Sequence, residues 1–437
     1  MHNIGVLLSG SSAVNAGQWQ RDADPQYHGF DGPIHTTTPA LNNRIYPLRK
    51  AVHDAYVEAG HETNEDPFKG NPIGISRQTE NWRPVSDIKA ERQPAAKALD
   101  LDGIHVRTNT LVRRVMIDSD LRATGVELTD GTELFATKEV ILCAGTFHTP
   151  QILMLSGIGP TEQLKQIDIP QIVDSPHVGQ HVFHHLALPQ AWQLKDPDKG
   201  LAMPHPKFMA HSGVLQGQPL DWWLFAKVPS DELKTALQRD DHSANDSHPI
   251  LAPGRCQLSI AVLYVPVATA NPEYGIKMDG SHIGGVVLMT LPSSRGQITL
   301  DSSDPSAQPV FDPNYLTSQA DKHVMREGVR SIHRVMETSS MRDYIEGETP
   351  PIGWTRLTST SSDVDLDKRI AAFAVSWHHA MGSAAMGKVI DAELRVKGVQ
   401  SLRVVDASIF PYPISATPQA TVYAFALRAA DLIAGAI

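Results

Sequence analysis

No Gly-x-Gly-x-x-Gly sequence occurs anywhere in the 437 residues of this chain. Proteins that bind a dinucleotide usually place that sequence between a strand and a helix, and the helix N-terminus receives the pyrophosphate. The nearest candidate, at residues 157–160, follows a predicted helix and has Pro160 where the binding helix should begin. We therefore expect a fold that lacks a dinucleotide-binding βαβ unit.

The composition is that of an ordinary globular protein, and the net charge excludes some partners. Hydrophobic residues make up 41% of the chain and charged residues 20%, so a sizeable core can form. A formal net charge of -10 repels nucleic acid and anionic membranes, because both are negatively charged. We expect a small-molecule substrate, with neither nucleic acid nor a membrane as partner.

Cysteine content and the lack of targeting segments indicate the compartment. Cys143 and Cys256 are too few for a disulfide framework or a cysteine-based zinc site. The first residues have no cationic start, and their apolar run is too short for a secretory signal. No stretch reaches the ~20 apolar residues of a membrane span. These features predict a cytoplasmic protein.

Polar and apolar residues alternate in two separate blocks, which predicts two antiparallel sheets. The first block covers residues 104–135 and leads into an apolar strand at 140–142. The second block covers three stretches between residues 257 and 300. After the apolar strand, Thr149 and Pro150 predict the start of a helix with proline in its first turn. Further helices are predicted at residues 47–60, 318–338 and 419–436.

Five segments of the chain form a recognisable set. Residues 145–159 read Gly-Thr-Phe-His-Thr-Pro-Gln-Ile-Leu-Met-Leu-Ser-Gly-Ile-Gly, which resembles, position for position, a diagnostic motif of the glucose-methanol-choline (GMC) oxidoreductases. Four other segments resemble the same family in the same order: residues 10–15, 292–296, 377–387 and 403–408. The resemblance therefore covers nearly the whole chain.

The resemblance implies a fold and an activity. Members of the family bind FAD, oxidise alcohols by hydride transfer to the flavin, and use an active-site histidine as base. Their fold is mixed, α/β with α+β, and pairs a discontinuous FAD domain with a substrate domain built on an antiparallel sheet. By that resemblance we expect a remnant FAD-binding-type domain at residues 1–185 and 372–437, and a substrate domain at 186–371.

The sequence departs from the family pattern in four places. The Gly-rich unit is missing, and after Asn15 the chain passes almost directly to the Tyr-His-Gly segment at 27–29. The family's Val-Gly-x-Asn-Leu-x-Asp-His has His181 and His184 in place of its Asn and Asp. The family's second catalytic position falls on Thr417, whose hydroxyl can donate a hydrogen bond but cannot act as a base near neutral pH.

Several residues are candidates for the chemistry of the site. His378 matches the family's base, and a pKa near 6.5 suits a residue that accepts and returns a proton. His379 next to it is expected to be structural, because adjacent side chains diverge. The residue that assists His378 in proton transfer is expected to be Thr417, through a hydrogen bond, or His184 or His185 as a second acid or base. The substrate pocket is expected to include Trp377, His379 and His181, and Trp222, Trp223 and Phe225 line either the pocket or the core.

The sequence is compatible both with a bound flavin and with no cofactor. Gly10, Ser11, Asn15, Asp406 and Ser408 match flavin-contacting positions of the family. Their presence fits either a bound flavin or a backbone that needs small residues with or without ligand. Without a pyrophosphate cradle, flavin contacts alone give weak affinity, so we expect no cofactor, with FAD as the alternative.

We also expect no metal at the cluster of His177, His181, His184 and His185. A metal site needs three or four converging ligands, and no Asp, Glu or Cys accompanies these histidines.

Three functions remain open. The first is a cofactor-independent enzyme on a GMC scaffold, in which His378 transfers protons in an isomerisation, cyclisation, elimination or addition of a natural-product-type molecule. The second is an FAD-dependent alcohol oxidoreductase whose nucleotide-binding part is supplied elsewhere. The third is an inactive binding or scaffold protein. A parallel sheet without its first strand and helix exposes an edge, so we expect residues 1–60 or a second subunit, as a homodimer or complementing chain, to cover it.

Overall fold

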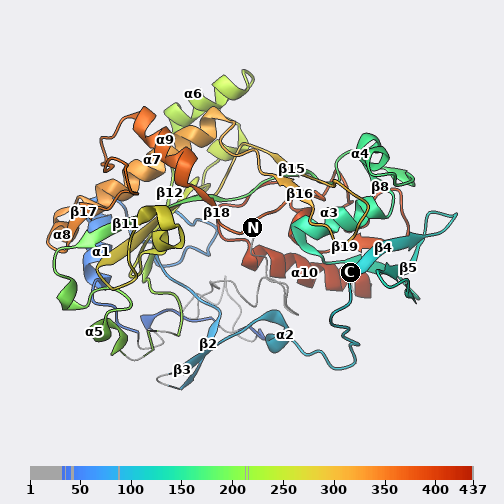
Figure 1. Ribbon diagram of the computed structural model, residues 1–437, viewed down its shortest axis with the longest axis horizontal. Coiled ribbons are helices and arrows are strands. Elements are labelled where there is room, and N and C mark those ends of the chain that lie inside the picture. The colour runs from blue at the N-terminus through green and yellow to red at the C-terminus, as the bar shows by residue number, and fades with distance from the viewer. Residues whose placement is uncertain are drawn as a thin grey trace.

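The computed structural model describes residues 32–34, 36–40, 44–86, 89–211, 213–214 and 216–435. The predicted flavin-facing residues Gly10, Ser11 and Asn15 lie outside these ranges. Figure 1 shows two lobes side by side, which we call the first and the second lobe. No helix among the described residues is long and apolar enough to cross a membrane.

A seven-stranded antiparallel sheet forms the centre of the first lobe. Its strand order is β1-β12-β13-β14-β11-β17, and β18 pairs with the start of β11 beside β17. The strands alternate side chains between two faces, as the period-two pattern predicts. Their bounds are β1 (Gly74–Arg77), β11 (Leu186–Leu194), β12 (Trp222–Ala226), β13 (Leu258–Leu263), β14 (His282–Met289), β17 (Ile345–Glu348) and β18 (Val375–Ser376).

Helices cover one face of this sheet. The long amphipathic helix α7 begins after Ser318, whose hydroxyl accepts a hydrogen bond from the N–H of Asp321 at 3.2 Å. Gly328 allows α7 to lie close to the sheet, because a Cβ there would come within 2.4 Å of the Val287 side chain. The helices of this lobe are α1 (Arg49–Glu58), α5 (Pro206–Met209), α6 (Ser230–Asp240), α7 (Gln319–Met336), α8 (Ser339–Arg342) and α9 (Asp363–Phe373).

The first lobe includes residues that the sequence placed in the other domain. Helix α1 buries Val52, Ala55 and Tyr56 in the same core cluster as Ile75 of β1, and β1 is an edge strand of the seven-stranded sheet. The expected domain limit of 1–185 therefore does not hold for residues 46–77. Their apolar face can be buried only against this sheet, a long-range contact that sequence spacing does not show.

The second lobe contains the predicted meander and a small parallel sheet. The antiparallel pairing of β4 with β5 and of β5 with β6 confirms the meander. Strands β7 and β19 pair in parallel, and helices α3 and α10 belong to this lobe (Figure 1). The elements are β4 (Val112–Ile117), β5 (Ala123–Leu128), β6 (Glu133–Phe135), β7 (Val140–Leu142), β19 (Leu402–Val404), α3 (Gly145–Leu155), α4 (Thr161–Gln166), α10 (Gln419–Ala434), β8 (Ile158–Gly159) and β9 (Val173–Asp174).

Helix α3 begins earlier than predicted. It starts at Gly145, so Pro150 lies inside the helix rather than in its first turn. Proline has no N–H, which leaves the carbonyl of Thr146, four residues earlier, without its helical partner. The hydroxyl of Ser383 donates to that carbonyl at 2.7 Å, and this side-chain bond replaces the missing backbone bond.

Smaller elements join or flank the lobes. Strands β10, β15 and β16 form a three-stranded antiparallel sheet, and β2 pairs with β3 as a hairpin. Their bounds are β2 (Trp82–Ser86), β3 (Lys89–Arg92), α2 (Ala95–Ala98), β10 (Gln180–Val182), β15 (Gly296–Thr299) and β16 (Val310–Asp312).

Candidate functional site

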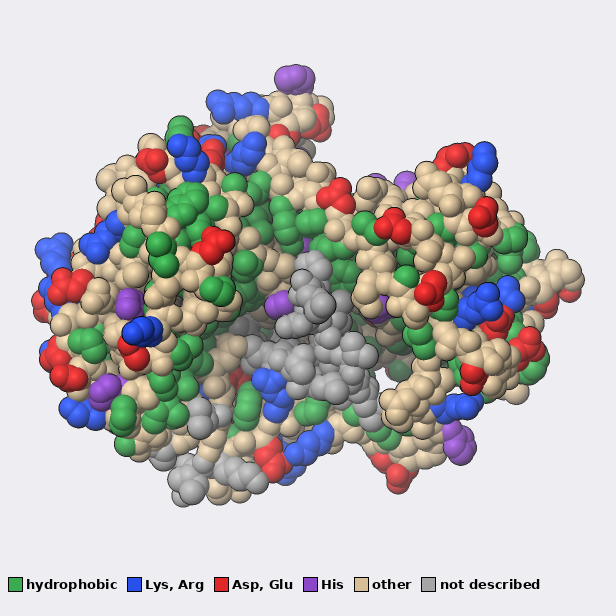
Figure 2. Space-filling model, in the orientation of Figure 1, with side chains coloured by type: hydrophobic (Ala, Val, Ile, Leu, Met, Phe, Trp, Pro, Cys, Tyr) green, Lys and Arg blue, Asp and Glu red, His purple; other side chains and the backbone are tan. Residues whose placement is uncertain are grey.

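Two segments that are distant in the sequence meet where the lobes join. Leu186, the first residue of β11, pairs with Ser376, the last residue of β18. Further along, Phe183 and Met381 exchange both of their backbone hydrogen bonds, each 3.0 Å long. The two segments therefore run antiparallel and carry the predicted histidines of both motifs to one place. Figure 2 shows histidine side chains at this junction.

The second of these segments bulges between its paired positions. The N–H of Trp377 donates to the carbonyl of His185 at 3.0 Å, and His378 follows with a φ of 59°. That left-handed conformation is uncommon for a residue other than glycine. It turns two adjacent histidines into different surroundings: His378 is exposed, while the ring of His379 lies against His185.

His185 and His379 form a close pair. Their Nδ1 atoms lie 3.0 Å apart, and the rings meet edge to face with centroids 5.0 Å apart and an interplanar angle of 84°. His185 is fully buried. A nitrogen–nitrogen distance of this length is that of a hydrogen bond, so one Nδ1 donates and the other accepts.

The surroundings keep this pair neutral. Burial, followed by the neighbouring His184, lowers the pKa of His185 to about 3. Burial, followed by His185, His184 and His378, holds the pKa of His379 well below its usual range. Desolvation disfavours the charged imidazolium. Near neutral pH both rings therefore carry one proton each and can accept another.

His184, a predicted acid or base, has both ring nitrogens engaged by the protein. Its Nδ1–H donates to the carbonyl of His185 at 3.0 Å. Its Nε2 accepts from the Ser376 hydroxyl at 3.0 Å, and the Ser376 oxygen accepts from the N–H of His378 at 3.3 Å. Both ring nitrogens of His184 are thus used to hold the bulge in place, so its predicted role in proton transfer is not supported by the geometry.

The sheet face next to the pair is apolar. Strand register puts four residues in one row across β11, β14, β13 and β12, and all but the third are apolar: Ala187, Leu288, Ser259 and Phe225. Trp223 and Trp377 belong to the same hydrophobic cluster. The indole N–H of Trp223 donates to Oε1 of Gln78. The sequence did not decide whether the two adjacent tryptophans line the pocket or fill the core. Trp223 lies on the sheet face next to His185, and Trp222 lies in the core on the opposite face of the sheet.

The loop before α10 lies over this face. The Cys256 thiol contacts the Ser415 carbonyl at 3.1 Å, and the backbone carbonyl of Ile414 interacts with the His185 ring. Thr417, predicted as the second catalytic position, belongs to this loop and is partly buried. The structure thus brings the loop of Thr417, but no second basic side chain from it, to the histidine pair.

Asp406 and Ser408 lie at the junction of β19 and α3. One carboxylate oxygen of Asp406 accepts from the Gly145 N–H at 3.0 Å and from the Thr149 hydroxyl at 2.6 Å. The other accepts from the Ser408 N–H at 2.7 Å. Asp406 therefore fixes the start of α3 to β19, which is a structural role whether or not a cofactor binds.

Several buried polar atoms of residues 408–419, the segment that leads into α10, have no hydrogen-bond partner in the structure. They are the hydroxyl oxygens of Ser408 and Ser415 and both amide atoms of Gln419. Buried groups of this kind are normally satisfied by protein, ordered water or a ligand. An amide offers one donor side and one acceptor, which complements a ring edge that carries both, such as the pyrimidine edge of a flavin. These groups therefore fit a polar planar ligand.

His181 lies apart from the pair. Its Nε2 is 3.1 Å from Nδ1 of His177 and 2.9 Å from Nζ of Lys388. Burial, then Lys388, His177 and Arg295, lower the pKa of His181. The chain here is not helical, and a φ of 63° at His181 interrupts the strand, so the spacing of four residues does not bring His181 to His185. Among the described residues no three His, Cys, Asp or Glu side chains converge as a metal site.

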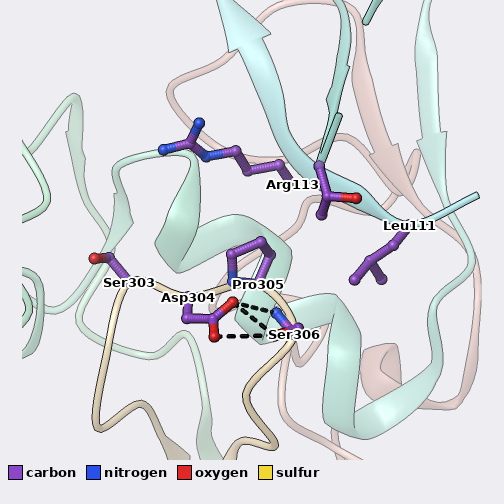
Figure 3. Close-up of a pocket in the computed structure, with 7 residues that line it drawn as sticks. Leu111, Arg113, Ser303, Asp304, Pro305 and Ser306 are labelled. Carbon is purple, nitrogen blue, oxygen red and sulfur yellow. Dashed lines mark hydrogen bonds between the residues drawn. The ribbon is translucent and has the colours of Figure 1, made fainter. Parts of the chain in front are cut away.

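Two surface hollows lie elsewhere, between β4, α3 and the loop after β15. Figure 3 shows the larger one, of about 420 Å³. Its charged side chains are already paired: Asp304 accepts from the N–H and hydroxyl of Ser306, both at 2.8 Å, and Arg113 binds Glu127 at 3.0 Å. The smaller, of about 240 Å³, is lined mostly by apolar groups of α3. Neither hollow contains a predicted catalytic residue, so we place the site at the histidine pair.

Two residues of the site were not found from the sequence. Ser376 connects His184 to His378, and the Thr290 carbonyl interacts with the His185 ring. Ser376 directly precedes the Trp-His-His motif, so the sequence offered a signal for it. Nothing in the sequence pattern distinguishes the Thr290 carbonyl.

Comparisons with known proteins agree with the fold and the motifs. Two sequence profiles described as GMC oxidoreductase match residues 1–187 and 292–426. "GMC-type oxidoreductase acuG" of Aspergillus aculeatus is 42% identical over 98% of this chain and 84% of its own length. "Versicolorin B synthase stcN" of Emericella nidulans is 30% identical over 93% of this chain and 64% of its own length. This chain thus spans between about two thirds and five sixths of these relatives.

Solved structures give the same result. A formate oxidase of Aspergillus oryzae, studied for modification of its FAD, superposes with a TM-score of 0.84 at 26% identity. The superposition covers 98% of this chain and 84% of the formate oxidase. The antiparallel substrate sheet and the discontinuous second lobe are therefore features shared with a known flavoprotein.

Proposed function

The chain belongs to the GMC oxidoreductase family, and we propose that it oxidises the CH–OH group of an uncharged, apolar small molecule with FAD. The observation that carries the proposal is the neutral pair of His379 and His185 at the end of an apolar sheet face. A neutral imidazole can take the hydroxyl proton of an alcohol. FAD, when bound, supplies the acceptor for the hydride.

We assign the proton acceptor to His379 rather than to His378, which the sequence favoured. His379 meets a second imidazole at 3.0 Å, whereas the ring of exposed His378 makes no hydrogen bond to a described residue. A base works best when a partner fixes its orientation and tautomer. The adjacent position is therefore the better candidate.

The apolar face supports an uncharged substrate. Trp223 and Phe225 are nearly buried, and Trp377 packs beside them. An ion placed against these side chains would lose its hydration without gaining a counter-charge, which is costly. Aromatic and aliphatic alcohols suit this surface, since their apolar bodies can pack on the tryptophans.

The groups near α10 support FAD as the cofactor. The unpartnered atoms of Ser408, Ser415 and Gln419 would hold the polar edge of the flavin ring. The sequence argument for no cofactor concerned the pyrophosphate alone. The partnerless groups and the likeness to formate oxidase both favour the alternative that the sequence left second.

A second candidate function is redox-neutral proton transfer, as in an isomerase or cyclase. Two observations favour it: Thr417 replaces the family's second catalytic side chain, and versicolorin B synthases are among the relatives. The same neutral histidine pair would move the proton in such a reaction.

The test is to load the purified chain with FAD and add alcohols without oxygen. We expect uncharged aryl and alkyl alcohols to bleach the flavin band, and alcohols with a carboxylate or quaternary ammonium group to leave it unchanged. Turnover to an isomer with an unbleached flavin would favour the second function. No turnover with any substrate of either class would favour a binding or scaffold protein.

A further inference from the structure

The contact between Nδ1 of His185 and Nδ1 of His379 restricts which nitrogen of each ring carries the proton. We infer that His185 is a positioning residue that accepts a hydrogen bond from Nδ1–H of His379 and thereby holds the lone pair of His379 on Nε2. The inference rests on the proposed function, in which His379 takes the substrate proton. It assigns to His185 a role that does not require contact with substrate.

Proton counting leaves two arrangements for the pair. Each neutral imidazole carries one N–H and one lone pair. At 3.0 Å the two Nδ1 atoms must share a single proton. Either His379 donates and its Nε2 carries the lone pair, or His185 donates and the Nε2 of His379 carries the proton. Only the first arrangement leaves Nε2 of His379 unprotonated and able to accept a proton.

The surroundings of His185 decide between them. The ring is fully buried, and the backbone carbonyls of Thr290 and Ile414 interact with it as acceptors. No described group donates a hydrogen bond to its Nε2. A carbonyl oxygen can only accept, so it favours an N–H and disfavours a lone pair opposite it. Because Nδ1 of His185 already meets Nδ1 of His379, we assign the proton of His185 to Nε2, which leaves its Nδ1 as the acceptor.

The other titratable groups near the pair do not disturb this arrangement. His184 has both ring nitrogens within hydrogen-bond distance of other groups, the His185 carbonyl and the Ser376 hydroxyl. His378 is exposed, and its backbone rather than its ring joins the network. Burial lowers the pKa of both His185 and His379. The pair thus holds one shared proton across the neutral pH range.

The arrangement defines where the proton goes. The hydroxyl proton of the substrate moves to Nε2 of His379, which then carries both ring protons and a positive charge. Its Nδ1–H still donates to the lone pair of His185, and this hydrogen bond strengthens when the donor becomes charged. His185 therefore stabilises the protonated form as well as the correct tautomer.

Nitrogen NMR of the protein labelled with ¹⁵N-histidine tests the inference directly. In the FAD-loaded chain at neutral pH, without substrate, we expect Nδ1 of His379 to be of the protonated type and Nε2 of the unprotonated type. His379→Gln assigns the signals by their loss. A His379 that carries its proton on Nε2 would overturn the inference, and this measurement needs no variant of His185.

Two variants of His185 provide a second test. His185→Asn keeps an acceptor close to the position of Nδ1, and His185→Phe keeps a ring but removes the acceptor. We expect His185→Phe to mix the two tautomers of His379 and to lower kcat at least about tenfold with little change in KM. His185→Asn should keep the tautomer and most of kcat. Equal kcat losses in both variants, with an unchanged tautomer, would overturn the positioning role.

This test separates the inference from the proposed function. The predicted tautomer together with no oxidation of any alcohol would overturn the function alone. Alcohol oxidation by a protein with the opposite tautomer would overturn the inference alone.

Discussion

The two lobes bury their sheets to very different extents. In the first lobe, seven antiparallel strands have an apolar core on each face. In the second lobe, the described residues form two parallel pairs of two strands each, β7 with β19 and β8 with β9. Ile141 in the centre of β7 is 39% exposed, and α10 fully buries only Ala429. The second lobe thus has a buried core cluster of its own, but the apolar surface of its helix α10 is only partly covered.

The exposed apolar side chains of β7 and α10 indicate that another group covers this part of the second lobe. Parallel sheets are normally covered on both faces, and a helix as apolar as α10 normally packs against another element. We propose that a bound cofactor or a second subunit covers this surface, because the expected cover at residues 1–60 does not hold for α1, which packs in the core of the first lobe. The contrast to be tested is between a lobe with an apolar core on each face of its sheet and a lobe whose helix α10 is only partly covered.

The largest effect is expected from a buried ion pair of the first lobe. Arg369 in α9 binds Glu348 in β17 at 2.6 Å, and both side chains are almost fully buried. Arg369→Ala leaves the carboxylate without its counter-charge, so we expect the free energy of unfolding to fall by about 3–5 kcal/mol. Urea unfolding measures it.

The matched control is Arg326→Ala, which removes a more exposed partner of Asp367 and should cost less than about 1 kcal/mol. If both substitutions cost the same, the first lobe does not depend on its buried pair.

The next effect concerns the site between the lobes. His379→Gln removes the proton acceptor, so we expect kcat/KM for alcohol oxidation to fall at least about 100-fold. His378→Gln, one residue away and exposed, should change it less than about threefold, because its ring bonds no described residue. Steady-state kinetics of both variants measure this. The reverse ranking would return the role of base to His378.

Acid should weaken the first lobe through its buried histidines. Burial lowers the pKa of His333 to about 3, so the native ring stays neutral while the unfolded ring, with a pKa near 6.5, takes up a proton. The unfolded state binds more protons between about pH 6.5 and 3, and stability therefore falls as the pH falls through this window. One such group contributes up to about 1.4 kcal/mol per pH unit.

The measurement is the pH dependence of urea unfolding for the wild type and His333→Gln. Glutamine can still meet Gln190, which lies 2.9 Å from Nε2 of His333, but does not titrate. For His333→Gln we expect the free energy of unfolding to fall less steeply with falling pH than in the wild type, by up to about 1.4 kcal/mol per pH unit. Equal slopes would show that His333 is not a neutral buried group in the native protein.

The smallest effect on stability is expected at the surface of α10. Leu427 is 64% exposed, so Leu427→Ser should change the free energy of unfolding by less than about 0.5 kcal/mol. It should nevertheless reduce self-association, because it removes part of an exposed apolar surface. Light scattering of both proteins measures this. A monomeric wild type with α10 solvated would contradict the idea that another chain covers it.

Local patterns predicted the elements well. The alternation at residues 104–135 gave β4 to β6, and the periodicity at 318–338 gave α7. Helix α3 differed because its start depends on Ser383, which is far away in the sequence and satisfies the carbonyl left free by Pro150. Residues 46–77 were assigned to the wrong lobe for a similar reason, since β1 finds its partner β12 across a long separation.

The sequence predicted which candidate residues come together, but not how they are arranged. The motifs brought His185, Trp377 and the histidines at 378 and 379 into one region, and the structure does so too. Which of the adjacent histidines turns inward depends on the positive φ of His378, which sequence alone does not specify. His184 matched an acid or base by residue type, and only its two hydrogen bonds show that it is occupied.

The most direct test of the account is the visible absorption spectrum of the purified chain during titration with FAD, followed by an uncharged aryl alcohol without oxygen. We predict a saturable change in the flavin spectrum and then bleaching, which His379→Gln should slow at least about 100-fold. A protein that leaves the flavin spectrum unchanged, yet converts a substrate without a change in oxidation state, would contradict the account and favour redox-neutral proton transfer.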